Sequence, residues 1–414
     1  MSQRLFDTLI NRTIKQGTLE VRHANGSTAR FGQPTPDYPN VAILFTDSRV
    51  TRDILLDLAL GAAEAFMDGR LLIERGDVMQ LVQLLRMNAR WDRGGSKPRA
   101  SLARRLTNRA AFAAEQVNQQ ITARRNVAHH YDIGNDLYRL MLDPEHMQYS
   151  CGYWPQEGMT LAQAQEAKLA HIAAKLRLRP DDMVLDIGCG WGGMAIYLAQ
   201  RFGVSVHGIT LSQEQLQLAK RRAEEAGVAD RIIFELIDYR DLPQRAFRYD
   251  RIVSVGMFEH VGRPQFETFF RTCATLLADS GVMLLHTIGR MGKPGTTDAF
   301  TRKYIFPGGY IPALSEMVAA SEKVRLIASD VETWRLHYAR TLRAWYASCE
   351  AHREAITAMF DDRFYRMWTF YLAGATAAFE SGSMCNYQIQ YIRQRDTLPL
   401  TRDYMAEAER RLTR

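Results

Sequence analysis

The sequence is poor in cysteine and has no long uninterrupted apolar segment. Its five cysteines are scattered and none forms a Cys-x-x-Cys pair, so neither a disulfide framework nor a zinc site is expected and no metal ligands are assigned. The most apolar long segment, Leu55 to Met67, contains Asp57 and Glu64, which argues against a span across a bilayer. The first fifteen residues lack the continuous apolar stretch of a signal peptide. These absences predict a cytoplasmic protein with reduced thiols.

Acidic residues are scarce in one region. The 414 residues are 46% hydrophobic and 24% charged, which is typical of a globular protein with two or three domains. Residues 86–125 contain ten Lys and Arg side chains but two acids, a surplus of eight, so the rest of the chain carries −1 of the formal net charge of +7. Such a basic band suits nucleic acid, an acidic protein or anionic lipid head groups, and a solvated helix face explains it equally well.

The chain is organised around the stretch from Met183 to Gly193, MVLDIGCGWGG. An apolar run that contains Asp186 and ends in three closely spaced glycines predicts a buried strand, a tight turn and a helix. Glycine lets the backbone approach a ligand closely, and the first N–H groups of a helix are free to face a polar or anionic group. The pattern therefore indicates a nucleotide-type ligand without naming it.

Strands and helices alternate from Met183 onward. We expect strands at 183–188, 205–210, 232–238, 251–256 and 282–288, and helices at about 193–202, 213–226 and 264–277. This alternation predicts a parallel, doubly wound sheet that binds its ligands at the carboxyl ends of the strands. Five candidate side chains fall at or just past those ends: Asp186, Thr210, Asp238, Glu259 and His286.

The flanking segments have weaker patterns. Residues 1–85 form a first unit with a strand at 40–47 and one amphipathic helix at 52–67, and residues 86–125 contain a turn-rich GGSKP linker. Thr160 is the expected N-cap of a helix that runs to Leu176. After Gly289 we expect an insertion, aromatic-rich helices at 338–359 and 364–380, and an edge or closing strand at CNYQIQYIRQR.

Seven motifs follow one another within residues 126–395. They are YSCGYW (149–154), VLDIGCGWGG (184–193), GITLSQEQ (208–215), SVGMFEHVG (254–262), LLHTIG (284–289), KYIFPGGYIP (303–312) and HYARTLRAW (337–345). Together they resemble the motifs of the cyclopropane-fatty-acyl-phospholipid synthase family. The resemblance implies an α/β, Rossmann-like class I methyltransferase fold, with a doubly wound, mostly parallel seven-stranded sheet, a helical insertion and a small α+β N-terminal domain. It divides the chain into a lipid-docking accessory domain at 1–85, the basic linker at 86–125 and the catalytic domain at 126–414.

The resemblance also implies a reaction. S-adenosylmethionine supplies a methylene to the cis double bond of an unsaturated phospholipid acyl chain, through methyl transfer, a carbocation and proton removal in a site that excludes water. In the family a bound bicarbonate ion is the base, and its ligands map to Cys151, Glu259, His286, the backbone of Ile288, and Tyr338. Taken singly, Cys151 is explained by packing, His286 by a core position and Glu259 by a helix N-terminus.

The residues that the resemblance assigns to S-adenosylmethionine come from four motifs. Tyr131, Tyr149 and Ser150 are expected near the methionine end, and Asp186, Gly188 and Gly190 at the glycine turn. Thr210, Leu211 and Gln215 are expected near the ribose, and Asp238 and Tyr239 near the adenine. One departure from the family pattern is Gly152, which stands where alanine is usual.

Three alternatives stay open. The leading hypothesis is a cytoplasmic enzyme attached peripherally to the inner face of the membrane, whose basic band meets anionic phospholipid. A second retains the fold and cofactor but gives a methyl-branched or methylated unsaturated chain, or acts on a small amine. The third is a lipid-carrier or nucleic-acid-binding protein with a vestigial methyltransferase fold. No nucleic-acid-binding module is visible in the sequence, however, and we do not expect nucleic acid as a partner. A homodimer is left open because family members are often dimers.

Overall fold

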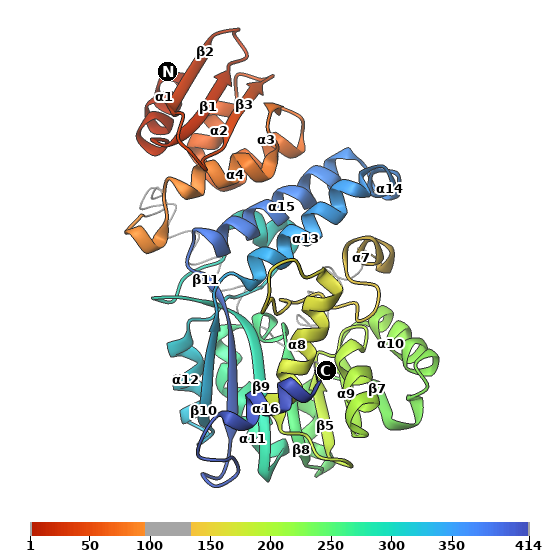
Figure 1. Cartoon of the computed structure of the whole chain (residues 1–414). Coiled ribbons are helices and arrows are strands. Elements are labelled where there is room, and N and C mark those ends of the chain that lie inside the picture. Colours follow the sequence, from red (N-terminus) through yellow and green to blue (C-terminus); the bar gives the residue numbers. More distant parts are fainter. Residues whose placement is uncertain (1, 96–133, 413–414) are drawn as a thin grey trace. The chain divides into compact units, whose positions relative to one another are not determined.

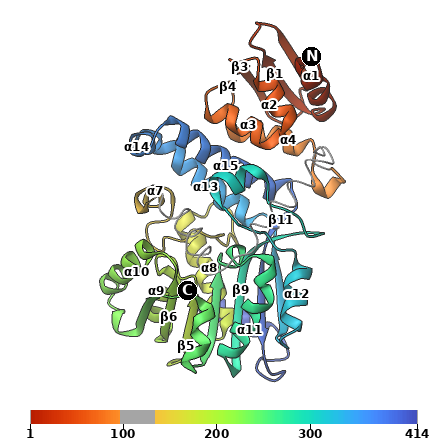
Figure 2. The ribbon, with the colours of Figure 1, turned by 180° about the vertical axis from the view of Figure 1, so that it is seen from behind.

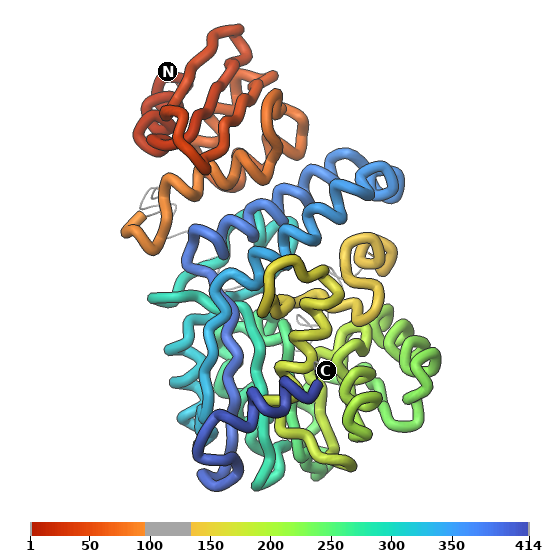
Figure 3. Tube along the Cα trace, in the orientation of Figure 1, coloured from red at the N-terminus to blue at the C-terminus, as the bar shows by residue number. Residues whose placement is uncertain are grey.

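The computed structural model describes residues 2–95 and 134–412, whose path is traced in Figure 3. The chain forms two compact units. Unit 1 contains the described parts of residues 1–111 together with 297–307 and 342–383, and unit 2 contains those of 112–296, 308–341 and 384–414. Each unit has its own sheet and its own hydrophobic core, so each is described by itself.

Unit 2 is built on a seven-stranded sheet with the order β10-β11-β9-β8-β5-β6-β7 (Figures 1 and 2). Strand β11 runs antiparallel to both of its neighbours, and the other pairs are parallel. The predicted doubly wound, mostly parallel sheet is therefore confirmed. The strands are β5 (Met183–Ile187), β6 (Ser205–Thr210), β7 (Ile232–Leu236), β8 (Tyr249–Val255), β9 (Leu277–Arg290), β10 (Ile327–Trp334) and β11 (Met384–Ile392).

Helices cover both faces of this sheet. One face carries α8 (Leu161–Leu176), α9 (Gly193–Phe202) and α10 (Gln213–Glu225), which form one apolar cluster with the strands. The other carries α11 (Phe266–Leu276) and α12 (Leu314–Glu322), which form a second cluster rich in phenylalanine. Two further helices complete the unit, α7 (Asn135–Met141) and α16 (Asp403–Leu412). With apolar cover on both faces, the central strands are buried and only their ends reach solvent.

Several predicted elements hold, one strand takes a different place in the sheet, and one strand was not predicted. Strand β6 and helix α9 have the predicted bounds, and Thr160 caps α8 in a reciprocal capping box with Gln163. The segment CNYQIQYIRQR was expected at an edge or as a closing strand; β11 is instead an interior strand, because β10 pairs with its outer side. The pattern missed β10, since most of its side chains are exposed and it lacks an apolar run.

Unit 1 contains a small α+β fold, as expected for the N-terminal domain. Its sheet has the order β2-β1-β3-β4, and its core lies between that sheet and the helices. The strands are β1 (Gly17–Arg22), β2 (Thr28–Gln33), β3 (Asn40–Phe45) and β4 (Leu71–Arg75). The helices of this part are α1 (Ser2–Thr13), α2 (Val50–Leu56), α3 (Leu58–Met67) and α4 (Val78–Met87).

The prediction of one helix over 52–67 is wrong. Asp57 adopts an extended conformation between α2 and α3, and its carboxylate accepts from the Leu60 N–H at 3.1 Å, as an N-cap does. The two helices then pack closely at Gly61, where an added Cβ would lie 2.3 Å from the Asp53 carbonyl oxygen. The aspartate that interrupted the apolar segment therefore ends one helix and begins the next.

The C-terminal helices of unit 1 also differ from prediction. The helix expected over 338–359 is two helices, α13 (His337–Ala351) and α14 (Arg353–Met359), with His352 between them. Helix α15 (Asp362–Glu380) packs against α3 and α4. Residues 342–383 thus form one compact unit with the N-terminal residues, whereas the sequence placed them with the catalytic domain. The first turn of α13 belongs to unit 2.

Some predictions fall outside the described residues. Tyr131 and most of the basic linker, from residue 96 onward, are among these. All five cysteines lie in the described residues, where they are free and buried. Within residues 2–95 and 134–412, none of the helices combines the length and the apolar character that crossing a bilayer requires.

Candidate functional site

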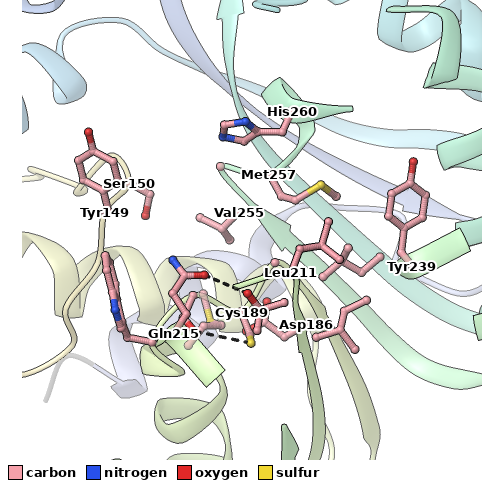
Figure 4. Close-up of a pocket in the computed structure, with 18 of the residues that line it drawn as sticks. Tyr149, Ser150, Asp186, Cys189, Leu211, Gln215, Tyr239, Val255, Met257 and His260 are labelled. Carbon is pink, nitrogen blue, oxygen red and sulfur yellow. Dashed lines mark hydrogen bonds between the residues drawn. The ribbon is translucent and has the colours of Figure 1, made fainter. Parts of the chain in front are cut away.

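A pocket lies at the carboxyl ends of β5, β6 and β8 in unit 2. It encloses about 1070 Å³ of space, part of which opens to solvent, and its wall is formed by the strand ends and by the segment before α8. Figure 4 shows Tyr149 and Ser150 on one side of the pocket and Tyr239 on the opposite side. This is the edge at which a doubly wound sheet binds its ligands.

The turn between β5 and α9 requires glycine for two reasons. Gly188, Gly190 and Gly192 all have positive φ angles, of 83°, 55° and 80°. At Gly192 an added Cβ would also lie 2.7 Å from the Phe234 ring, so conformation and space both exclude a side chain there. Backbone N–H groups of Gly188 and Cys189 donate to the Ile209 carbonyl at 2.9 Å, which fixes the turn against β6.

The structure brings the predicted cofactor residues together. Ten of the eleven line this pocket: Tyr149, Ser150, Asp186, Gly188, Gly190, Thr210, Leu211, Gln215, Asp238 and Tyr239. The eleventh, Tyr131, lies outside the described residues.

Two of these residues are already fixed by protein contacts. The Thr210 hydroxyl donates to Gln215 Oε1 at 2.9 Å, a bond visible in Figure 4. The Asp238 carboxylate accepts from Arg240 Nε at 2.8 Å and Nη2 at 2.7 Å, so a neighbouring guanidinium compensates its buried charge. Arg240, which the sequence motifs did not single out, also lines the pocket.

Asp186 is the buried acid of the pocket. It is 2% exposed, and its Oδ2 atom has no hydrogen-bond partner among the described residues. Burial raises the pKa of Asp186 to about 7, against the opposing effect of Lys168. A buried, unpaired carboxylate oxygen in a pocket calls for a cationic or hydrogen-bonding ligand, so the site fits a positively charged cofactor.

The base-site candidates lie beside this pocket rather than in its lining. Glu259 follows β8 in a short turn, Phe258–His260, and is 7% exposed. Its Oε1 atom accepts from the Ile288 N–H of β9 at 2.6 Å, whereas Oε2 has no partner among the described residues. Burial raises the pKa of Glu259 to about 7, against the opposing effects of the Ile288 N–H and the Thr287 hydroxyl. Two of the five predicted residues are thus in direct contact.

His286 lies two residues before Ile288 on β9 and is 1% exposed. Its ring nitrogens face two amides of β11, with Nδ1 3.1 Å from Gln388 Nε2 and Nε2 3.4 Å from Asn386 Nδ2. Burial lowers the pKa of His286 well below its usual value, so the ring is neutral. The sequence pattern gave the alternation of β11 but no reason to expect polar partners inside the sheet.

Thr341 fixes the segment that contains Cys151 against the helix that carries Tyr338. The Thr341 hydroxyl, fully buried on α13, accepts from the Gly152 N–H and from Trp154 Nε1, both at 3.0 Å, and thereby holds the segment that contains Cys151. Tyr338 lies three residues before Thr341 on the same helix. Burial raises the pKa of the Cys151 thiol above its usual range, so this cysteine is a neutral group and not a thiolate nucleophile.

Glu259 offers one feature that fits a small oxyanion carrying one proton. Its Oε2 atom is a buried acceptor without a hydrogen-bond partner among the described residues, which suits the hydroxyl of bicarbonate. Cys151, His286 and Tyr338 are the polar groups that would hold its other oxygens, according to the sequence resemblance.

One cluster of metal-ligand types occurs at the surface of unit 2. Glu145, His146 and Glu166 offer ligand atoms within 4.8 Å of one another. His146 Nε2 is 2.6 Å from Glu166, and Arg201 also pairs with Glu166 at 3.2 Å. The cluster is explained as a partly solvated ion-pair group, and we assign no metal to it.

Sheet order, glycine turn and pocket together define an S-adenosylmethionine-dependent methyltransferase of class I. The chain belongs to the mycolic acid cyclopropane synthetase family, whose sequence model matches residues 118–389.

Known proteins similar to the chain agree with this family. A probable fatty acid methyltransferase of Pseudomonas putida is 40% identical over 288 residues, 67% of this chain and 73% of that protein. The cyclopropane-fatty-acyl-phospholipid synthase of Escherichia coli K12 is 43% identical over 264 residues, 64% of this chain and 66% of that protein. Among solved structures, the mycolic acid cyclopropane synthase CmaA1 complexed with SAH and CTAB has a TM-score of 0.61 at 31% identity, covering 65% of this chain and 97% of that one.

Proposed function

We propose that the protein is a cyclopropane-fatty-acyl-phospholipid synthase that acts on cis-unsaturated acyl chains of phospholipids, with bicarbonate as the base. The observation that carries the proposal is the buried carboxylate of Glu259, whose Oε2 atom lacks a partner among the described residues. Neutral His286 follows on the adjacent strand, and the similar E. coli protein is named for this activity.

The chain's own residues have three tasks in this reaction. The glycine turn and Asp186 hold S-adenosylmethionine, which supplies an electrophilic methyl group when bound. Glu259 accepts a hydrogen bond from the hydroxyl of bicarbonate and so orients the ion. When bound, bicarbonate supplies a base that removes one proton from the newly attached methyl group. Burial of Glu259 and His286 excludes the water that would otherwise trap a carbocation on the acyl chain.

Product analysis tests the proposal. The purified protein is incubated with S-adenosylmethionine and vesicles of a cis-unsaturated phospholipid, and the acyl chains are then analysed by mass spectrometry. We expect one added CH2 per double bond, no change in a matched saturated lipid, and loss of product in the Glu259→Gln variant. If no unsaturated lipid gains mass while SAH still binds, the proposed substrate is wrong.

A methylated or methyl-branched chain is the second candidate product. The Pseudomonas putida relative is named a probable fatty acid methyltransferase, which supports this alternative. A cyclopropane and a methylated alkene have the same mass, so the product must also be hydrogenated: an alkene takes up two hydrogens under mild conditions, whereas a cyclopropane resists. Methylation of a small amine would leave every acyl chain unchanged in both assays.

We also propose that the protein attaches peripherally to the inner face of the membrane, through the basic band at 86–125. The support is its surplus of eight positive charges, which suits anionic head groups. Co-sedimentation with anionic and zwitterionic vesicles tests it. We expect binding to anionic vesicles that falls as salt shortens the screening length from about 10 Å at 0.1 M. Equal binding to both lipids would contradict an electrostatic attachment.

A further inference from the structure

Lys168 is a fully buried lysine on α8 behind the wall of the cofactor pocket. Its Nζ atom donates to the Ser150 hydroxyl at 2.8 Å and to Gln148 Oε1. One turn earlier, Gln165 Nε2 donates to the Ser150 carbonyl at 3.0 Å and to the Gln148 carbonyl at 3.3 Å. Since residues 148–150 line the pocket, α8 fixes this wall through two polar side chains.

The hydrogen-bond partners of Lys168 do not compensate its charge. The Ser150 hydroxyl and Gln148 Oε1 are both neutral acceptors, and a buried ammonium needs a negative charge nearby. The charged or titratable groups that act on Lys168 are Asp143 in the segment after α7, Cys151 in the following loop and Asp186 at the end of β5. The positive charge of Lys168 also contributes to lowering the pKa of His286 on β9. Because Cys151 and His286 are neutral, Asp143 and Asp186 are the counter-charges.

We propose that Lys168 is a positioning residue for S-adenosylmethionine: its ammonium holds the Gln148–Ser150 wall of the cofactor pocket and acts as the buried counter-charge of Asp186. The inference concerns the cofactor pocket and does not depend on which acyl product forms. Lys168 thus acts on the cofactor indirectly, through Asp186, whose Oδ2 atom has no hydrogen-bond partner among the described residues and can accept from the ligand.

The physical reason is that each charge lowers the cost of burying the other. Burial lowers the pKa of Lys168 to about 7 even with Asp143 and Asp186 nearby, and burial raises the pKa of Asp186 to about 7 even with Lys168 nearby. Without the ammonium, the pKa of Asp186 rises further, and the acid is protonated at neutral pH. A protonated Asp186 cannot form an ion pair with the ammonium group of the cofactor's methionine part, which SAH also has. Cofactor binding therefore weakens and recovers only at higher pH.

SAH binding measured by calorimetry tests this without any lipid. We expect Lys168→Met to bind SAH about 10- to 100-fold more weakly than wild type at pH 7, the range for one lost buried charged hydrogen-bond partner. The deficit relative to wild type should shrink at pH 8.5, where Asp186 ionises again. In an Asp186→Asn background, Lys168→Met should cost less than in wild type, since the two residues act as a unit.

Lys175→Met is the matched control. Lys175 lies seven residues further along α8 and is also buried, but its ammonium pairs with Glu332 on β10 and it does not line the pocket. This variant should lose thermal stability and keep the wild-type affinity for SAH. If Lys168→Met is insoluble, Lys168→Gln removes the same charge and serves in its place.

The proposal is overturned if the Lys168 variant binds SAH within threefold of wild type, or if its deficit is the same at pH 6.5 and pH 8.5. The proposal would also be overturned if Lys168→Met weakened SAH binding equally in wild type and in the Asp186→Asn background. The lysine would then act on the Gln148–Ser150 wall alone. Failure of every lipid to react, with the SAH results as expected, would count against the proposed substrate and leave this inference supported.

Discussion

The burial of Glu259 predicts a specific dependence of stability on pH. The pKa of this carboxyl is raised from 4.5 to about 7, mainly by desolvation. Below pH 4.5 the carboxyl is protonated in both folded and unfolded chains, and it contributes no pH dependence. Between pH 4.5 and 7 the unfolded chain releases this proton while the folded chain retains it, so stability falls as pH rises. At about 1.4 kcal/mol per pKa unit, ionised Glu259 destabilises the folded state by about 3 kcal/mol above pH 7.

Glu259→Gln removes this pH dependence and retains an oxygen to accept from the Ile288 N–H. Urea denaturation at pH 5 and pH 8, in buffers depleted of bicarbonate, gives the change in unfolding free energy for each protein. We expect wild type to lose about 2.5 kcal/mol more than the variant between these two pH values, because the unfolded chain has already released most of this proton at pH 5. Comparing the change with pH, rather than the stabilities themselves, cancels the cost of burying an unpaired amide.

A matched control is Glu267→Gln on α11, whose carboxylate is 39% exposed and pairs with Arg271 and Lys323. Exposed ion pairs contribute little to stability, so this variant should follow the wild-type pH dependence closely. Added bicarbonate should stabilise wild type, by about 2.7 kcal/mol at a hundred times its dissociation constant, and have little effect on Glu259→Gln. If Glu259→Gln has the same pH dependence as wild type, Glu259 is not a strained buried acid and the reasoning fails.

Three further predictions concern other parts of the chain. Thr341→Val should slow product formation and cost about 1–3 kcal/mol in urea denaturation for each buried donor left unpaired, while Thr341→Ser restores both. Asp57→Ala removes the N-cap of α3 and should cost about 1 kcal/mol in the same assay, with Asp57→Ser close to wild type. Gly192→Ala should weaken SAH binding in calorimetry far more than Gly190→Ala, because only the former adds a close contact to the same backbone strain; equal effects would contradict this.

The order of elements in unit 2 follows from local patterns in the sequence. Apolar runs of five to seven residues, alternating with amphipathic segments, predict the parallel strands and the helices between them. What these patterns do not predict is partner choice. Strand β10 exposes most of its side chains, so its sequence does not look like a strand, and without it β11 has no reason to be interior. Helix breaks at Asp57 and His352 depend on tertiary contacts and capping that periodicity does not report.

The candidate site was predicted unevenly. Residues at strand ends converge because parallel strands place their carboxyl ends at one edge, which sequence alone implies for Asp186 and Thr210. The hydrogen-bond partners of His286, another residue of the candidate site, could not be predicted in the same way. Asn386 and Gln388 reach His286 from a strand about a hundred residues further along the chain, and no spacing rule connects them.

Helix α8 shows the physical cause of such misses. Lys168, His171 and Lys175 occur at helical spacing, a pattern that is typical of a solvated helix face, yet all three are buried. The far end of this face is structural: Glu332 of β10 accepts from His171 at 2.8 Å and also pairs with Lys175. The near end has no carboxylate in hydrogen-bond contact and instead faces the cofactor pocket through Gln148. A protein that buries a charge without a direct counter-ion bears a cost in stability, and such exceptions to local consistency are expected where a ligand completes the site. The contrast between Lys168 and Lys175 on one helix therefore separates the part of this polar face that stabilises the fold from the part that, in our proposal, positions the cofactor.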